Sequence, residues 1–190
     1  MVSETVRVFG PIDLLVNNAG LPGNETLLWD EPASDWWRVV EVNLRGPFLL
    51  ARTVLPGMIA RKRGRIINMS SGVGAMPYAI DSAYPVSKAA LFRLTDCLAE
   101  MTNPYGVSVL AISPGLVHTE MTNNMEMFKR VPEDQWMPAE ATADLCLLIA
   151  SGAADRLSGR YLHVQADIQQ MIERADEIVE NDLYVLRMRQ

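Results

Sequence analysis

The sequence predicts an α/β fold in which helices cover the faces of a parallel β-sheet. Short, continuous apolar runs alternate along the chain with longer segments of helical periodicity. This alternation is the order expected of β-α-β units, which place their strands parallel and their helices on the sheet faces. The chain has 190 residues, enough for one domain with a sizeable core.

Four strands are predicted, and each is an apolar run with little polar alternation. Such runs are typical of parallel strands, because these strands are buried on both faces. The first run ends in Asn17-Asn18-Ala19-Gly20, a sequence that closes a strand with a turn. The predicted strands cover residues 12–16, 65–69, 107–112 and 160–164.

The longest predicted helix covers residues 35–61. Ser34 is expected to cap its N-terminus, because a serine hydroxyl accepts a hydrogen bond from a free N–H of the first turn. Gly46-Pro47 and Pro56 are expected to bend the helix, since proline removes an internal hydrogen bond. The other helices predicted before the end of the chain cover residues 2–9, 83–102 and 138–151.

The chain is predicted to divide into a main unit, residues 1–164, and a C-terminal amphipathic helical extension, residues 165–190. Within the extension an apolar stripe recurs at helical spacing among acidic residues. The stripe could pack on its own domain or across a subunit boundary, and packing on its own domain is favoured. Its members are Ile168, Met171, Ile172, Ala175, Ile178 and Val179.

Composition excludes several classes of function. The net charge is −6 and the only basic run is Arg61-Lys62-Arg63, which argues against nucleic acid as a partner. No apolar run reaches the roughly 18 residues of a membrane span, and the first residues of the sequence lack the charged-then-apolar pattern of a signal peptide. Cys97 and Cys146 are expected to be buried free thiols, which favours a cytoplasmic protein. His118 and His163 lack the partners of a metal site.

Three residues suggest an acid–base site. Tyr84 and Lys88 lie four positions apart, so that one helical turn places both on the same face. A neighbouring positive charge favours the phenolate form of a tyrosine and so lowers its pKa. Ser71 precedes Tyr84 by thirteen positions and could hold a carbonyl oxygen while a proton moves. The Tyr84–Lys88 pair alone also fits an ordinary surface helix, so the surrounding motifs must distinguish between the two interpretations.

Those motifs resemble the short-chain dehydrogenase/reductase family, in the family's order and at compatible spacings. The resemblance extends over residues 6–164, most of the chain, and implies a Rossmann-like, doubly wound parallel sheet. Its segments are Val16-Asn17-Asn18-Ala19-Gly20, Val42-Asn43-Leu44-Arg45-Gly46, Gly64-Arg65-Ile66-Ile67-Asn68-Met69-Ser70-Ser71, Ser82-Ala83-Tyr84-Pro85-Val86-Ser87-Lys88-Ala89-Ala90-Leu91 and Ser113-Pro114-Gly115-Leu116-Val117-His118-Thr119.

The resemblance implies an NAD- or NADP-dependent oxidoreductase that interconverts an alcohol and a carbonyl. Tyr84 would be the general acid or base, Lys88 would lower its pKa and bind the nicotinamide ribose, and Ser71 would orient the substrate oxygen. Ser70 is the alternative to Ser71, at a spacing one residue too long. Asn43 would complete a tetrad by holding a water near Lys88 through its helix backbone.

The same resemblance implies a cofactor site, although a plain turn explains several of its residues equally well. Small residues after the first strand permit close approach of a dinucleotide, and Thr119 would lie near the carboxamide. The preference between NAD and NADP is left open. The implied cofactor-binding residues are Asn17, Ala19, Gly20, Tyr84, Lys88, Pro114, Gly115, Val117 and Thr119.

The chain departs from the family by lacking the N-terminal strands and the glycine-rich turn that hold the cofactor pyrophosphate. The strand at residues 12–16, central in the family, is therefore expected to be an exposed apolar edge. A truncated gene product, a mis-started reading frame and a fragment that relies on a partner are all open explanations. The competing hypothesis is thus a non-catalytic fragment or pseudoenzyme that cannot hold a dinucleotide.

Two further expectations concern the substrate and the assembly. The resemblance implies a mobile lid over the substrate in the stretch after the third strand. The methionines of this stretch favour a bulky, apolar alcohol or carbonyl compound, although ordinary core packing is the alternative. The helices at 35–61 and 83–102 resemble the pair that forms a four-helix interface in the family, which implies a homodimer or homotetramer. An epimerase or dehydratase would share the Tyr-Lys pair but fits the other motifs less well. The proposed lid residues are Met121, Met125, Met127, Phe128, Trp136 and Met137.

Overall fold

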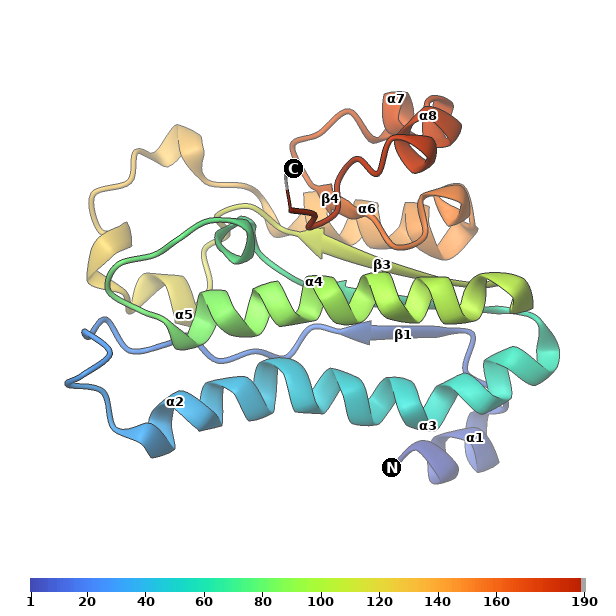
Figure 1. The fold of residues 1–190 in the computed structure, drawn as a ribbon, viewed down its shortest axis with the longest axis horizontal. Helices are drawn as coiled ribbons and strands as arrows, with labels where there is room; N and C mark the ends of the chain where they lie inside the picture. Colours follow the sequence, from blue (N-terminus) through green and yellow to red (C-terminus); the bar gives the residue numbers. More distant parts are fainter. Residues whose placement is uncertain (189–190) are drawn as a thin grey trace.

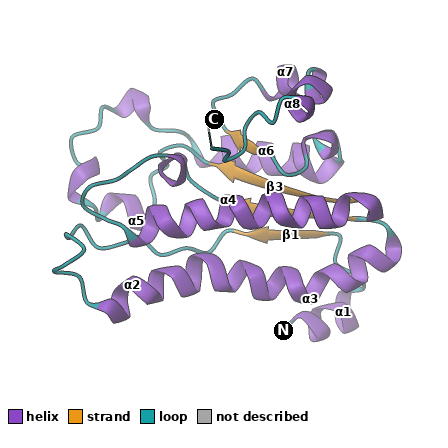
Figure 2. Ribbon diagram, viewed as in Figure 1, coloured by secondary structure: helices purple, strands orange, loops and turns teal. Residues whose placement is uncertain are grey.

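A parallel sheet of four strands forms the centre of the structure, a computed structural model that describes residues 1–188 (Figure 1, Figure 2). The strands lie side by side in chain order, β1-β2-β3-β4, and every neighbouring pair is parallel. The predicted α/β fold is confirmed. The strands are β1 (Leu14–Asn17), β2 (Gly64–Met69), β3 (Val107–Ser113) and β4 (Tyr161–His163).

Helices connect the strands and cover both faces of the sheet. Figure 1 shows α3 and α4 running side by side along one face. Short 3₁₀ turns link several elements. The helices are α1 (Val2–Phe9), α2 (Ala33–Val40), a π-helix (Glu41–Arg45), α3 (Gly46–Arg61), α4 (Ala83–Thr102), α5 (Glu120–Asn123), α6 (Ala139–Ser151), α7 (Ile168–Glu173) and α8 (Ala175–Glu180).

Two hydrophobic clusters, one on each side of the sheet, hold these three layers together. Successive residues of a strand point to opposite faces, so Ile66 and Ile67 of β2 enter different clusters. Ile66 packs with Val54 of α3 and Ala99 of α4. Ile67 belongs to the cluster of α6, where Ile149 is buried. Helices therefore pack on both faces of the central strands, as in a Rossmann-like sheet.

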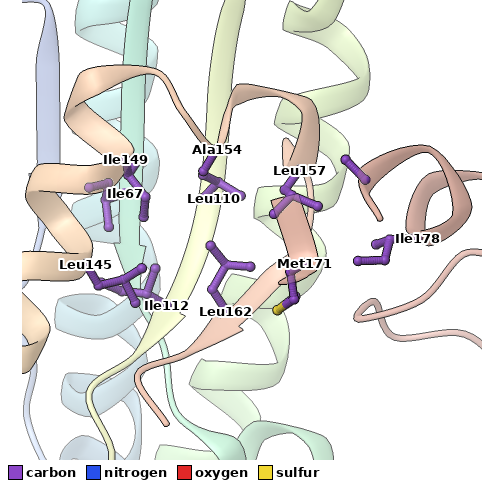
Figure 3. Close-up of a cluster of buried hydrophobic side chains, with 11 residues drawn as sticks. Ile67, Leu110, Ile112, Leu145, Ile149, Ala154, Leu157, Leu162, Met171 and Ile178 are labelled. Atoms are coloured by element: carbon purple, nitrogen blue, oxygen red, sulfur yellow. The ribbon is translucent and has the colours of Figure 1, made fainter. Parts of the chain in front are cut away.

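The C-terminal extension contributes to the second cluster (Figure 3). Met171, Ala175 and Ile178 are buried beside residues of β3, β4 and α6. The single helix suggested by the stripe is in fact two, because the backbone leaves helical geometry at Arg174. Residues 189 and 190 of the predicted extension lie outside the described residues.

The long helix predicted over residues 35–61 is divided differently from the expectation. It begins at Ala33 with Pro32 at the N-cap, so the prediction of a Ser34 cap was wrong. The interruption is the π-helix between α2 and α3, which starts five residues before Gly46. Pro56 lies inside α3, which continues to its end at Arg61. The proline therefore does not end the helix.

Strand β1 forms one edge of the sheet and leaves apolar side chains exposed. Leu14 is 36% exposed and Val16 is 39% exposed. Val16 pairs in register with Ile67, so it points to the face that α6 covers elsewhere. Leu15, on the other face, packs against the α3 cluster. The expectation of an exposed apolar edge is met in the described residues.

Neither cysteine forms a disulfide in the structure. Cys146 is half-buried but Cys97 is exposed, so the prediction that both thiols are buried was wrong for Cys97. Across residues 1–188, none of the helices combines the length and the hydropathy that crossing a bilayer demands.

Candidate active site

Tyr84 lies in the first turn of α4 and is partly buried. Its backbone N–H donates to the Asp81 carboxylate over 3.1 Å, which anchors the start of the helix. Burial raises the pKa of the phenol, a hydrogen bond with Ser71 lowers it, and the charge of Asp81 raises it again. Burial is the largest of these effects. The pKa of Tyr84 is therefore raised, contrary to the expectation of a lowered value, and the phenol keeps its proton.

Lys88 follows one turn later on the same side of α4. Its Nζ donates to the carbonyl oxygen of Met69 at the end of β2 over 2.8 Å and lies 5.2 Å from the centre of the Tyr84 ring. The side chain is only 4% exposed. Burial lowers the pKa of Lys88 from 10.5 to about 8. An amine that is easily deprotonated thus stands next to a phenol that keeps its proton.

The two serines after β2 have different partners. Ser71 contacts the Tyr84 phenol and lines the cavity described below. Ser70 is buried and its hydroxyl donates to the backbone carbonyl of Lys88 over 3.4 Å. Only Ser71 is therefore in a position to meet a group in the cavity beside the phenol.

Asn43 lies in the π-helix and is 1% exposed. Its amide oxygen accepts from the N–H of Leu21 over 2.8 Å, and its amide nitrogen donates to the Leu21 carbonyl over 2.9 Å. The same nitrogen donates to the hydroxyl of Ser87 over 3.0 Å. The side chain thus ties the loop after β1 to α4. That Asn43 holds a water through its backbone stays a prediction.

The loop after β1 comes close to these residues. A side chain at Gly20 would begin 3.3 Å from Asn43 Oδ1 and 3.6 Å from Lys88 Nζ, so a residue without one lets the backbone approach. Asn17 is 6% exposed, and its amide nitrogen donates to Asn68 Oδ1 over 2.8 Å. Its own Oδ1 is buried without a partner in the structure. Ala19 is exposed.

The loop after β3 reaches the same edge of the sheet. Gly115 has φ +70°, and a Cβ there would lie 2.8 Å from Met137 Cγ, so both backbone and space require glycine. Pro114 and Val117 are half-buried beside it. Thr119 caps α5, and its hydroxyl accepts from the N–H of Thr122 over 3.2 Å. The predicted cofactor residues of this loop therefore lie with those of β1 at the carboxyl ends of the strands, where α/β sheets bind ligands.

A cavity of about 250 Å³ opens beside Tyr84 and Ser71. Its far wall comes from the segment after β3, as the sequence suggested. Trp136 and Met137, also proposed for the lid, do not line the cavity. Trp136 instead stacks on His118, with ring centres 3.8 Å apart. The apolar residues that line the cavity are Val73, Leu116, Met121, Met125, Met127 and Phe128.

Two acidic residues that the sequence analysis missed shape this region. Asp81 lines the cavity and is 4% exposed. Glu25 accepts from the N–H groups of Glu126 and Met127 over 3.3 Å and 3.2 Å, and so links the loop after β1 to the cavity wall. Asp81 could have been found as a cap, three residues before Tyr84. No local pattern marks Glu25, whose partners are about a hundred residues away.

The lowered pKa of Lys88 makes protein stability depend on pH. The unfolded chain keeps the lysine proton at pH values where the folded protein has lost it, so folding becomes more favourable as pH rises. Relative to a Lys88→Met variant, the wild-type free energy of unfolding should rise by roughly 3 kcal/mol between pH 8 and pH 10.5. Urea denaturation at several pH values measures this. The exposed Lys129→Met control should follow wild type, and parallel curves for Lys88→Met would contradict the prediction.

Comparison with known proteins places the chain in a family. Residues 1–129 match the model of the short chain dehydrogenases. A short chain dehydrogenase of Pseudocercospora fijiensis is 35% identical over 195 residues, which cover 93% of this chain and 62% of that protein. The 3-oxoacyl-(acyl-carrier-protein) reductase FabG of Staphylococcus epidermidis is 32% identical over 170 residues, covering 86% of this chain and 69% of the reductase.

A solved structure agrees with these sequence matches. The gluconate 5-dehydrogenase of Burkholderia cenocepacia, in complex with NADP and tartrate, superposes with a TM-score of 0.79 at 29% identity. The superposition covers 89% of this chain and 69% of the dehydrogenase. The chain thus spans between three fifths and seven tenths of the length of these relatives. The family model covers residues 1–129, and the parallel sheet agrees with it. These similarities show that the chain belongs to the short-chain dehydrogenase family.

Proposed function

We propose that this protein is an NAD- or NADP-dependent oxidoreductase that interconverts an alcohol and a carbonyl compound. The observation that carries the proposal is that Tyr84 and Ser71 lie together in the wall of a largely apolar cavity, with the buried Lys88 beside the Tyr84 ring. The family supports it, since relatives of this chain are named dehydrogenases and reductases. A carbonyl group in the cavity would meet the Ser71 hydroxyl and the Tyr84 phenol together.

Each residue then has a defined task. Ser71 donates a hydrogen bond to the carbonyl oxygen, and Tyr84 gives that oxygen its phenolic proton as the alcohol forms. The raised pKa of Tyr84 suits a proton donor, because burial keeps the phenol protonated. The ammonium of Lys88, 5.2 Å from the ring, favours the phenolate that remains. The reverse sequence removes a proton from an alcohol.

The residues at the carboxyl ends of β1 and β3 fit a nicotinamide group. A bound nicotinamide supplies or accepts the hydride of such a reaction. Gly20 leaves space beside Lys88 Nζ, which would donate to the ribose. Asn17 Oδ1 is a buried acceptor with no partner in the structure. Ala19 is exposed on the same loop, and Gly115 faces the cavity from the other side.

The experiment that tests this function is an assay of reduced nicotinamide oxidation with apolar ketones, at millimolar NADH and NADPH. Ser71→Ala should lower turnover by roughly 10²-fold, because the group that orients the carbonyl is lost. Ser70→Ala is the matched control and should stay within about tenfold of wild type, since its hydroxyl contacts only the backbone of α4. Equal losses in both variants would contradict the assignment of Ser71.

A second candidate is a protein without catalytic activity that keeps the family fold. The observation in its favour is that the 190 residues contain no glycine-rich turn to hold a pyrophosphate. The two candidates differ in the same assay. Oxidation of NADH or NADPH that requires both a ketone and Tyr84 supports the enzyme, whereas its absence for every ketone at millimolar cofactor supports the second candidate.

The free thiols of Cys97 and Cys146 fit a reducing compartment, and we propose the cytoplasm.

An apolar groove on the outer surface of α2, α3 and α4 supports a homodimer. It measures about 550 Å³, and its lining includes Trp37, Leu44, Phe48 and Leu94. Trp37 is 60% exposed and Phe48 is 45% exposed, which leaves large apolar surface in contact with water. These are the helices whose sequences resemble the pairing helices of the family. A second copy of the chain would cover both grooves at once.

A charge in this groove should therefore separate the subunits. Phe48→Arg is expected to halve the mass measured by light scattering at micromolar concentration, because an arginine would be buried without a partner in the interface. The matched control is Leu147→Arg on α6, where leucine is 68% exposed on the opposite side of the sheet. The control should keep the wild-type mass. A wild-type monomer at this concentration would contradict the proposed dimer.

A further inference from the structure

The cavity beside Tyr84 has negative groups around it and no positive group in its lining. Among the described residues that line it, none is lysine or arginine. Lys88 stands behind the phenol and donates to the backbone at Met69 rather than into the cavity. The polar lining consists of hydroxyl groups and one carboxylate, that of Asp81. A ligand here therefore meets apolar side chains, hydroxyls and a single formal charge.

Asp81 is held in the cavity wall by backbone groups. Its carboxylate accepts the N–H of Tyr84 over 3.1 Å, and the side chain is 4% exposed. Burial raises the pKa of Asp81, and hydrogen bonds from the backbone of Tyr84, Ala83 and Gly23 offset part of this by stabilising the ionised form. Any side chain at Gly23 would collide with the carboxylate, so the loop after β1 closes directly over it. All of these partners are donors, and no lysine, arginine or histidine among residues 1–188 forms an ion pair with Asp81.

The charge of Asp81 also affects the pKa values of two neighbouring side chains. Burial first, and then the charges of Asp81 and Glu25, raise the pKa of Tyr78, which also lines the cavity. Burial and the Asp81 charge likewise raise the pKa of Glu31, whose Oε2 is buried without a hydrogen-bond partner. Burial is the largest cause of both shifts, and the nearby carboxylates add to it because a negative charge disfavours further negative charge. The potential at this wall is therefore negative.

We infer that the site accepts uncharged apolar carbonyl compounds and rejects those that carry a carboxylate, and that Asp81 is the residue that enforces this choice. The inference rests on the proposed oxidoreductase function and specifies its substrate class. Like charges at close range repel more strongly beside apolar walls, such as those of this cavity, than in bulk water. A carboxylate inside it would also lose its hydration without gaining a cationic partner. A neutral ester or ketone of the same shape meets neither penalty.

The test compares two ketones that differ only in charge, methyl 4-acetylbenzoate and 4-acetylbenzoate. Wild type should reduce the ester with a kcat/KM at least about tenfold above that of the carboxylate. Asp81→Asn removes the charge but keeps an oxygen that can cap α4, since asparagine is as good an N-cap as aspartate. Any effect on the start of α4 or on Tyr84 is common to both ketones, so the quantity to compare is the ratio of kcat/KM for the carboxylate to kcat/KM for the ester, which should rise about tenfold in this variant. Asp144→Asn, on the exposed side of α6, is the control for net charge and should change neither value.

Several results would overturn the inference. One is equal use of both ketones by wild type. Another is an equal loss for both ketones in Asp81→Asn, which would show that Asp81 only supports the start of α4. If neither ketone is reduced, the proposed function fails, and ligand-observed NMR of the two compounds with the same proteins still decides the inference. Tighter binding of the ester than of the carboxylate by wild type, with the difference lost in Asp81→Asn, would support the inference. Equal binding of the two compounds by wild type would contradict it.

Discussion

Replacing Tyr84 with phenylalanine is expected to lower turnover by roughly 10²–10⁴-fold, the share that a positioned general acid or base contributes. The change removes one oxygen atom, and with it the proton that would reach the substrate. The aromatic ring keeps its place beside Lys88, so the helix and the cavity should be retained. Steady-state assays with an apolar ketone at millimolar cofactor measure the effect on kcat.

The control for this variant is Tyr105→Phe. Tyr105 lies beyond the other end of α4 and is 44% exposed, so the loss of its hydroxyl should leave turnover unchanged. Binding of reduced nicotinamide should be alike in wild type and both variants, because the phenol acts on the substrate oxygen. Turnover of Tyr84→Phe within about threefold of wild type would remove Tyr84 from the proposed mechanism.

The 190-residue chain is expected to bind NADH and NADPH weakly, with a dissociation constant on the order of 1 mM or above. The pyrophosphate of a dinucleotide is normally held by the N–H groups of a glycine-rich turn and the start of a helix, and the sequence contains no such turn. Lys88 and the loop near Thr119 could orient a nicotinamide. These contacts alone would have to offset several kcal/mol of lost translational and rotational freedom.

Isothermal titration calorimetry with each dinucleotide measures this affinity. A useful comparison is the titration with nicotinamide mononucleotide, which lacks the second nucleotide and its pyrophosphate link. If only the nicotinamide end is held, the mononucleotide should bind within about tenfold of the dinucleotide. Micromolar binding of NADH or NADPH would contradict the prediction and would mean that another segment holds the pyrophosphate.

The exposed edge of the sheet bears on both experiments. Leu14 and Val16 of β1 present apolar side chains to solvent, and the outer side of the strand has no neighbouring strand in the described residues. Such an edge can pair with another chain. Samples for both measurements should therefore be checked for aggregation, because a loss of soluble protein would resemble a loss of function.

The sequence by itself determined the order of the elements, because a buried strand and an amphipathic helix each leave a local pattern. The run at residues 65–69 reappears as β2, and residues 83–102 form α4 with the bounds that were predicted. The Tyr84–Lys88 pair follows from the same local rule, since residues four apart share one face of a helix. Motifs of this kind depend on neighbours in the sequence, so they can be read without a structure.

Only the tertiary structure decided which side chains meet across the sheet edge. Ser70 and Ser71 are adjacent in sequence, yet one bonds to the backbone of α4 and the other contacts the phenol. Asn43 lies in a π-helix that no residue pattern predicted, and its side-chain amide is hydrogen-bonded to Leu21, 22 residues earlier in the loop after β1. The sequence could mark Asp81 only as a helix cap, and the fold places its charge in the cavity wall. Burial and long-range contacts set pKa values and hydrogen-bond partners, and these arise only when distant segments pack together.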